Sequence, residues 1–157
     1  ETILIHNEIA DICLPDLINA LSERSCEIRG CKETQNYSHN IIAAKDEDWR
    51  SEYLLPIVSI KIIKDFDEAL THIDSYSSGH TESIITENLN TAARFQNELD
   101  SAIVMHNTST QFADGGEFGL GGEIGIATGK FHARGPVGAN QLTSFKYLVN
   151  GDGHIRS

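Results

Sequence analysis

The residues most suited to chemistry lie in a glycine-rich stretch near the C-terminal end. Nine of the thirteen glycines fall between Gly115 and Gly138, and glycine permits backbone conformations and close ligand approaches that other residues resist. The segment from Gly115 to Gly125 has Gly-x-Gly spacing, but it lacks the strand–glycine–helix frame of a dinucleotide fingerprint and has no P-loop lysine. A tight packing turn is the simpler interpretation, and a phosphate cradle is the alternative.

The other reactive side chains do not form a self-contained catalytic or metal site. The seven histidines show neither the i, i+4 pairing nor the adjacent carboxylates that metal ligation uses. Cys13, Cys26 and Cys31 are an odd number without metal spacing, which also argues against a disulfide framework. Ser109 lacks the context of a nucleophile elbow. We therefore expect no metal site and no catalytic triad.

Elements that would position these residues follow from an alternation of apolar runs and helical patterns. Strands are expected near 2–5, 27–31, 57–63, 82–86 and 102–106, and helices near 7–25, 66–76 and 88–99. Asn7 and Glu8 are suited to start the first helix, and Asp65 is the expected N-cap of the second. This order predicts a mostly parallel sheet with helical crossovers, in which ligands gather at the C-terminal ends of strands.

Two further segments have simple interpretations. The charged run from Lys45 to Asp48, just before Trp49, is typical of a solvated face at a helix start. Leu142 to Val149 has the alternation of a strand, and the Asn150-Gly151 pair indicates a hairpin turn before the short end from His154 to Ser157. Such a terminal strand can pair with a sheet edge on another subunit.

Composition limits the class of protein. The formal net charge of -11 repels phosphate backbones and anionic lipid surfaces, so nucleic acid and membranes are not expected partners. No apolar run reaches the roughly 20 residues that span a bilayer, and a cytoplasmic location is expected. One globular domain fits the length. The sequence starts with Glu1, already inside a strand pattern, which favours a fragment of a longer protein.

Several motifs together resemble the γ-glutamyl phosphate reductases of the aldehyde dehydrogenase superfamily. The resemblance covers essentially the whole chain and is strongest after Gly79. Its motifs are Gly79-His80-Thr81-Glu82, 112–119 (Phe-Ala-Asp-Gly-Gly-Glu-Phe-Gly), 122–126 (Gly-Glu-Ile-Gly-Ile), 132–136 (His-Ala-Arg-Gly-Pro) and 142–147 (Leu-Thr-Ser-Phe-Lys-Tyr).

The resemblance implies an enzyme of proline biosynthesis. Enzymes of this family use NADPH to reduce γ-glutamyl phosphate to glutamate semialdehyde and phosphate, through an attacking cysteine and a thioester that accepts hydride. The family's cysteine falls just upstream of Glu1, so this chain contains no catalytic residue, and its three cysteines do not align with the nucleophile. The N-terminal cofactor-binding half is an expected partner, and the chain by itself is expected to be inactive.

The resemblance also assigns binding residues. In the superfamily a Glu-x-x-x-Pro glutamate binds the nicotinamide ribose, and Glu52 in Glu52-Tyr53-Leu54-Leu55-Pro56 resembles it. A carboxylate can accept both ribose hydroxyls, although a plain solvated charge is the alternative.

Substrate-binding residues are expected in the loop that resembles the superfamily's anchoring loop. They are Asn107, Thr108, Ser109, Thr110 and Phe118. Arg134 could hold a carboxylate or phosphate through two hydrogen bonds, with a structural ion pair as its alternative. His80 either contacts substrate or caps a turn, and the turn is favoured because a histidine needs a partner to act.

The predicted fold is therefore α/β: three layers with a mostly parallel sheet and helical crossovers, as in an aldehyde dehydrogenase catalytic domain, plus a C-terminal β arm. We expect a catalytic domain at 1–140 and oligomerisation strands at 141–157, which would form a homo-oligomer. The alternative function is a non-catalytic assembly or interaction module, or a degraded remnant of that enzyme.

Overall fold

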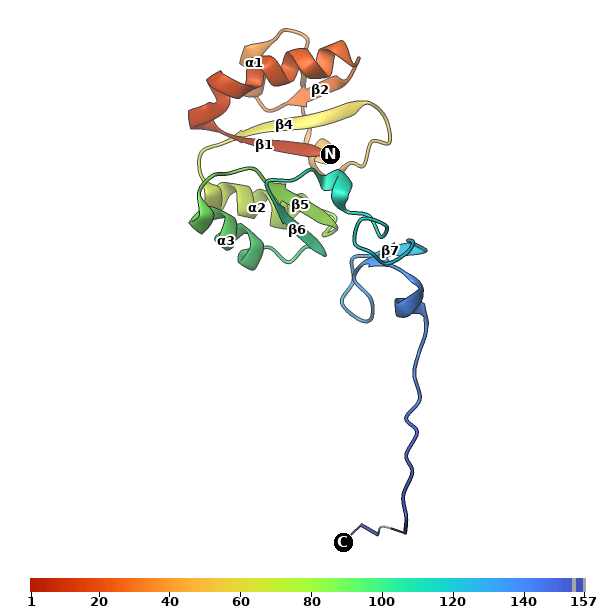
Figure 1. Cartoon of the computed structure of the whole chain (residues 1–157). Coiled ribbons are helices and arrows are strands. Elements are labelled where there is room, and N and C mark those ends of the chain that lie inside the picture. Colours follow the sequence, from red (N-terminus) through yellow and green to blue (C-terminus); the bar gives the residue numbers. More distant parts are fainter. Residues whose placement is uncertain (154, 157) are drawn as a thin grey trace.

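The computed structural model describes residues 1–153, 155 and 156, and Figure 1 shows a body of helices and strands followed by an extended C-terminal arm. The strands are β1 (Thr2–His6), β2 (Glu27–Gly30), β3 (Ile42–Ala43), β4 (Ile57–Ile63), β5 (Thr81–Ile84), β6 (Ile103–His106), β7 (Gly125–Ala127) and β8 (Gly135–Val137). The α-helices are α1 (Asn7–Glu23), α2 (Phe66–Tyr76) and α3 (Leu89–Glu98), and the short 3₁₀ helices are η1 (Thr34–Tyr37), η2 (Asp46–Arg50), η3 (Thr110–Phe112) and η4 (Ala139–Leu142).

The strands pair mostly in parallel, as predicted. One sheet has the order β1-β4-β2-β3, and β5 pairs with β6 in a second sheet; every pair in both is parallel. A small antiparallel pair, β7 with β8, was not predicted. It joins the middle of the glycine-rich stretch to its end, and both strands are too short to show a periodic pattern.

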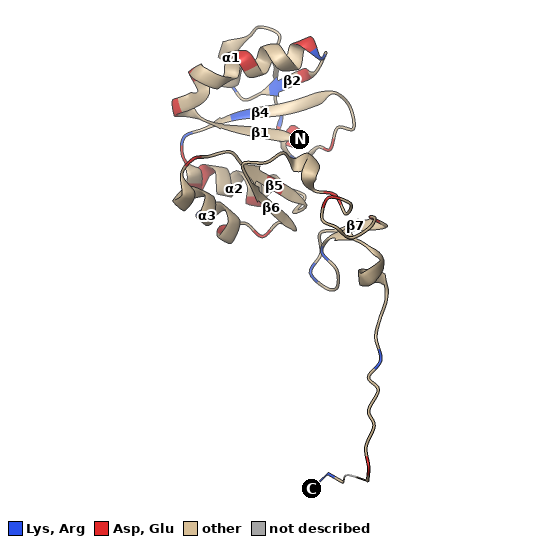
Figure 2. Cartoon of the chain, in the orientation of Figure 1, with Lys and Arg blue, Asp and Glu red and all other residues tan. Residues whose placement is uncertain are grey.

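The two faces of β4 contact different helices because side chains alternate along a strand. Val58, Ile60 and Ile62 pack with α1 in the main core, where Ile60 is fully buried. Lys61 points to the other face, and its Nζ lies 3.2 Å from Oε1 of Glu68 on α2. The sheet therefore lies between helical layers, with α1 on one side and α2 on the other. Figure 2 shows basic residues on β2 and β4, inside a body whose helices carry mainly acidic residues.

Capping residues explain where the helices begin. Asp65 accepts a hydrogen bond from Glu68 N–H at 2.8 Å, which confirms the predicted N-cap of α2. Asn88 caps α3 with the same chemistry. At α1 the cap is His6, whose Nδ1 accepts from Glu8 N–H at 3.3 Å, one residue before the predicted start.

No helix in residues 1–153 or 155–156 is long and apolar enough to cross a membrane.

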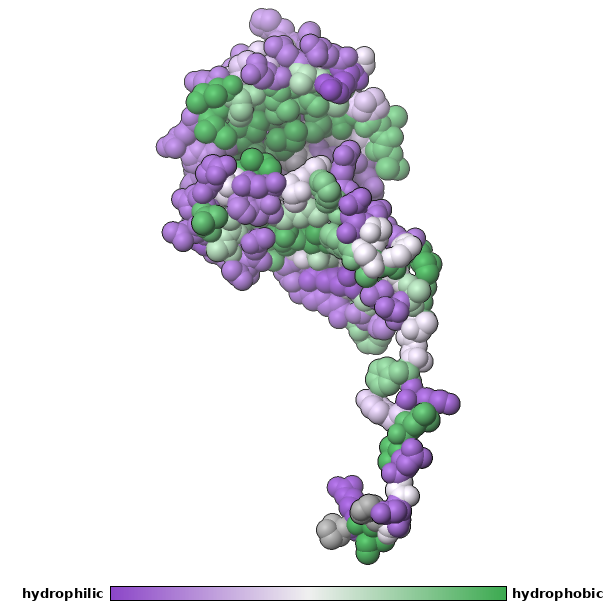
Figure 3. Space-filling model, viewed as in Figure 1, coloured by the Kyte–Doolittle hydropathy of each residue, from purple (hydrophilic) through white to green (hydrophobic). Residues whose placement is uncertain are grey.

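The predicted C-terminal strand and hairpin do not form within the single chain, and their pairing with another subunit stays a prediction. After η4, residues 143–153 run without helix or strand, and all of them are exposed. Figure 3 shows hydrophobic atoms along this arm, outside the main body. A strand exists only with a hydrogen-bonded partner, and no edge of the described sheets reaches the arm. His154 and Ser157, the ends of the last predicted segment, lie outside the described residues.

Candidate functional site

Glu52 lies in the irregular segment between η2 and β4. Its side chain is exposed, and it forms no hydrogen bond or ion pair with any described residue. The residues on either side of it are fixed: Ser51 N–H donates to the carbonyl of Asp48 at 3.3 Å, and Tyr53 N–H donates to Oε2 of Glu1 at 2.7 Å. Glu52 is thus a free carboxylate on a restrained backbone, next to the start of the chain.

A polar cluster that includes Tyr53, the residue after Glu52, lies on the sheet face opposite α1. It consists of Arg29, Asp48, Tyr53 and Ser59, and we call it the Asp48 cluster. The Arg29 guanidinium donates to Oδ1 of Asp48 at 2.5 Å and lies 4.9 Å from the centroid of the Tyr53 ring. The Tyr53 hydroxyl donates to the same carboxylate oxygen at 3.0 Å and lies 2.7 Å from Oγ of Ser59. These contacts tie the Glu52 segment to β2 and β4.

Asp48 is charged despite its burial, which leaves it only 3% exposed. Burial opposes the charge, but hydrogen bonds from Lys45 N–H, Arg29 and Tyr53 outweigh it and lower the pKa of Asp48 below its ordinary value. This corrects the prediction of a solvated acidic face: Asp46 and Glu47 are exposed, whereas Asp48 is not. The 3₁₀ turn of η2 points one residue of the run inward.

The predicted substrate loop begins where β6 ends, and much of its polarity serves the loop itself. Asn107 joins two loops, because its side chain accepts from Thr86 N–H at 2.8 Å and donates to the Thr86 carbonyl at 3.0 Å. The Thr108 carbonyl accepts from the Ser83 hydroxyl at 2.6 Å. Ser109 caps η3. Thr110 is exposed, with no side-chain hydrogen bond to the described residues, so its hydroxyl is available to a ligand.

The glycine-rich loop that carries Phe118 closes on itself. Oδ1 of Asp114 accepts from Gly116 N–H at 2.7 Å, and Oε2 of Glu123 accepts from Gly115 N–H at 3.1 Å. A Cβ on Gly115 would lie 3.0 Å from the Glu123 Cβ. These amides are occupied by the chain's own carboxylates, which favours the packing-turn interpretation over a phosphate cradle. The Phe118 ring is exposed beside them.

Arg134 and His80 lie away from Asn107, toward the starts of β6 and β5. The Arg134 guanidinium donates to Oδ1 of Asp100 at 2.9 Å, as in the structural alternative, while its Nε is buried with no partner among the described residues. Nδ1 of His80 lies 2.7 Å from Oγ1 of Thr81. Glu52 likewise lies before the start of a strand, β4.

Of the predicted residues, only Asn107–Thr110 directly follow the carboxyl end of a strand, which is β6.

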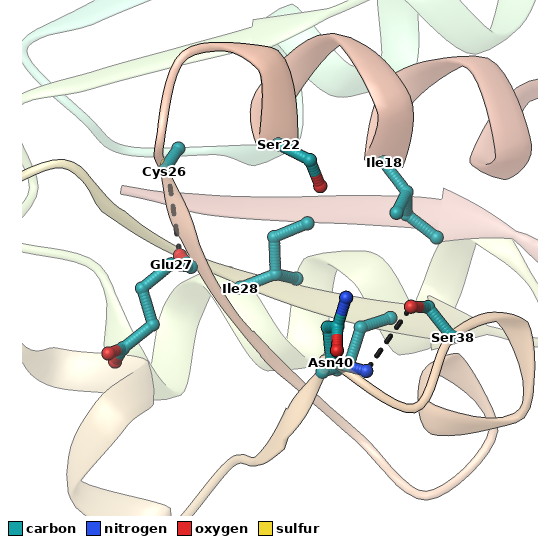
Figure 4. Close-up of a pocket in the computed structure, with 8 residues that line it drawn as sticks. Ile18, Ser22, Cys26, Glu27, Ile28, Ser38 and Asn40 are labelled. Carbon is teal, nitrogen blue, oxygen red and sulfur yellow. Dashed lines mark hydrogen bonds between the residues drawn. The ribbon is translucent and has the colours of Figure 1, made fainter.

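Two cavities formed by the described residues are smaller than a usual ligand pocket. Figure 4 shows one of ≈ 70 Å³ between α1, β2 and the loop before β3, lined by Ile18, Cys26 and Asn40 among others. A second, of ≈ 170 Å³, borders Gly79 and Asp100. Ligand pockets span roughly 300–1,000 Å³. Nor do the described residues bring three or more His, Cys, Asp or Glu side chains together as a metal site would need.

Sequence reasoning missed the Asp48 cluster. One signal was present: Arg29 alternates with Ile28 in a strand of a sheet covered on both faces, and such an arginine needs a buried acceptor. The sequence does not say which acidic residue supplies it, because Asp48 lies nineteen positions away and reaches Arg29 only through the tertiary fold.

Comparison with known proteins places this geometry in context. Residues 38–148 match the model of the aldehyde dehydrogenase family. The γ-glutamyl phosphate reductase of Rhodospirillum rubrum is 57% identical over 156 residues, and that of Methylorubrum extorquens is 55% identical over 156 residues. Each alignment covers 99% of this chain but 36% of the relative. The chain thus spans little more than a third of their length.

Solved structures show the same similarity at the level of the fold. The crystal structure of γ-glutamyl phosphate reductase from Thermotoga maritima matches with a TM-score of 0.94 and 47% identity, over 100% of this chain and 38% of that one. A propionaldehyde dehydrogenase from Clostridium phytofermentans matches with a TM-score of 0.58 at 18% identity, over 91% of this chain and 40% of that one. The second likeness concerns the fold alone.

Proposed function

We propose, on the premise that this chain belongs to the aldehyde dehydrogenase family, that it is part of an NADPH-dependent γ-glutamyl phosphate reductase. In this role it completes an active site whose cysteine and cofactor domain lie in an upstream part. The observation that carries the proposal is the 57% identity to a reductase of that name across 99% of the chain. The enzyme would act in proline biosynthesis, in the cytoplasm.

Glu52 fits a nicotinamide cofactor in one respect. A ribose diol is neutral and donates two hydrogen bonds, which an unpaired carboxylate accepts well, and Glu52 has no competing partner among the described residues. The bound cofactor would supply hydride. The contribution of this chain is to hold the ribose end of the nicotinamide half, while the remaining contacts and the choice of NADPH belong to upstream residues.

The substrate-binding group is proposed to be Asn107, Thr108, Ser109, Thr110 and Phe118. Thr110 offers a free hydroxyl, and Asn107 keeps the loop in shape through its two hydrogen bonds to Thr86. In the view of Figure 1, η3 and the first residue of the chain both lie on the right-hand side of the body. An upstream cysteine would enter the fold from that side.

Arg134 and His80 remain candidates only if substrate binding displaces their present partners.

The test is a chimera that joins residues 1–157 to the upstream part of the Rhodospirillum rubrum reductase. We expect the chimera to oxidise glutamate semialdehyde in the presence of phosphate and NADP⁺, and the chain alone to show no turnover. Glu52→Gln should weaken NADPH binding about tenfold, equal to roughly 1.4 kcal/mol, with little change in the KM for the semialdehyde. A folded chimera without reductase activity would contradict the proposal.

A second candidate function is an assembly module, favoured by the exposed apolar arm. Phe145, Tyr147 and Val149 are each at least 79% exposed, and such residues usually meet a partner. We propose pairing with the same region of a second copy. If the isolated chain forms a defined oligomer by light scattering while the chimera stays inactive, this function is the better description.

A further inference from the structure

The segment that carries Glu52 has no regular secondary structure, yet it is fixed at both ends. Upstream, the Ser51 hydroxyl donates to a carbonyl of η2 at 2.7 Å. Downstream, the Pro56 carbonyl accepts the N–H of Glu27 at 2.8 Å. In the middle, Leu54 is 82% exposed, so hydrophobic burial does not hold this part of the loop.

The backbone of Leu54 is strained, so contacts other than hydrophobic burial must hold it. Leu54 has a φ of 52°, in the left-handed region that L-residues rarely adopt because Cβ crowds the following carbonyl oxygen. A strained and exposed position relaxes unless neighbouring contacts hold it. Tyr53 supplies such contacts at three points: its backbone N–H, its hydroxyl and its ring.

Two arginines of neighbouring segments have partners other than Glu52. Arg29 is held by Asp48 at 2.5 Å and by Glu27 at 2.8 Å. Arg50, two residues before Glu52, lies over the ring of Tyr76 at 4.9 Å from its centroid. Neither arginine pairs with Glu52. An ion pair there would compete with a neutral diol for the same oxygens.

We infer that Tyr53 and Asp48 are positioning residues for Glu52: the buried Asp48 carboxylate holds the Tyr53 hydroxyl, and Tyr53 fixes the backbone from which Glu52 reaches the cofactor ribose. The inference rests on the proposed function, in which Glu52 binds the nicotinamide cofactor. Neither residue touches the cofactor. Arg29 neutralises the buried charge of Asp48.

The experiment uses the chimera and measures the dissociation constant of NADPH by fluorescence titration, with folded fraction and Tm recorded by circular dichroism. Tyr53→Phe removes only the hydroxyl and should raise the dissociation constant about fivefold, the equivalent of one lost hydrogen bond. The KM for glutamate semialdehyde should not change. Asp48→Asn should shift NADPH binding in the same direction.

The matched control is Tyr37→Phe. Tyr37 also donates to a carboxylate, that of Asp11, at 2.5 Å, and the variant should leave NADPH binding unchanged.

The double variant Glu52→Gln/Tyr53→Phe distinguishes positioning from general stabilisation. If Tyr53 acts through Glu52, the double variant binds NADPH no worse than Glu52→Gln alone, because the two effects are coupled. A lower Tm with unchanged NADPH binding in Tyr53→Phe, or fully additive losses, would overturn the inference while leaving the proposed function intact. Wild-type binding in Glu52→Gln would overturn both the assignment of Glu52 and the inference.

Discussion

At the scale of single residues, His72 is a buried histidine without a hydrogen-bonding partner for its Nε2 among the described residues. It lies on α2, with its ring centroid 5.3 Å from that of Trp49 and 4.7 Å from that of Tyr76. Burial, assisted by the charge of Lys61, lowers the pKa of His72 to about 4. The side chain is therefore neutral in the folded protein at any pH well above that value.

This pKa makes the free energy of unfolding depend on pH. An unfolded histidine titrates near 6.5, so as the pH falls below about 6.5 the unfolded chain binds a proton that folded His72 refuses. Stability contributed by neutral His72 is present above that pH and is lost progressively toward pH 4. Between pH 7.5 and pH 5 the loss should be about 2 kcal/mol, measurable by urea denaturation of the chain.

His72→Phe provides the comparison, because phenylalanine keeps the aromatic contacts and has no proton to gain. The variant should show a flatter dependence of unfolding free energy on pH between 7.5 and 5. Asp48 and Glu68, whose pKa values are lowered, contribute at more acidic pH. An identical slope in the variant and the parent chain would show that other groups cause the dependence.

At the scale of elements, the start of α2 depends on its cap. Asp65 accepts from Glu68 N–H at 2.8 Å, and Oε2 of Glu68 accepts in return from Lys64 N–H at 2.9 Å. Asp65→Ala should therefore lower the free energy of unfolding by about 1 kcal/mol. The matched control is Asp74→Ala in the last turn of the same helix, where an acidic residue opposes the helix dipole and its removal should be neutral or slightly stabilising. Equal losses in both variants would contradict a capping role.

The glycine-rich loop offers a second test at this scale, based on space. Gly115→Ala would place a Cβ 3.0 Å from both the Gly122 carbonyl oxygen and the Glu123 Cβ, whereas Gly122→Ala meets nothing within 4 Å. We expect Gly115→Ala to reopen the loop and to raise hydrogen exchange at its amides by about tenfold, as a strain of 1–2 kcal/mol would. Gly122→Ala should keep the exchange of the parent chain, and similar exchange in both variants would argue against close packing.

At the scale of the whole molecule, the body and the arm have different physical grounds for their order. The body buries a core between α1 and the four-stranded sheet, while residues 143–153 are exposed throughout. Two aromatic rings of the arm, Phe145 and Tyr147, contact mainly each other, with centroids 5.2 Å apart. The stability of the body should therefore not depend on the arm.

Deleting residues 144–157 tests this separation. The free energy of unfolding should change by less than about 0.5 kcal/mol, as for surface changes generally, while the mass of the chimera in solution should fall to that of a smaller oligomer. Analytical ultracentrifugation measures the second effect. An unchanged mass would remove the proposal that the arm forms the oligomer, and a large loss of stability would mean that the arm contacts the body.

The sequence by itself determined the order and type of most elements. β-branched runs, helical spacing and capping residues are local signals, so β4 and α2 were predicted with their observed bounds and the parallel pairing followed from the alternation. The family resemblance was also visible in the sequence, and the 57% identity to the Rhodospirillum rubrum reductase confirms it. The binding roles that the resemblance assigns to Glu52 and to the loop after β6 stay predictions.

Only the tertiary structure decided which charges are buried and which strands form. Asp48 looked solvated because three neighbouring positions are charged, yet the turn of η2 brings it to Arg29 across the sheet. The arm has the alternation of a strand, but its residues 143–153 pair with no strand of the described chain, and a strand requires hydrogen bonds from outside itself. Local patterns specify conformation, whereas burial and pairing depend on residues distant in sequence, which is why the Asp48 cluster could not be predicted from the sequence.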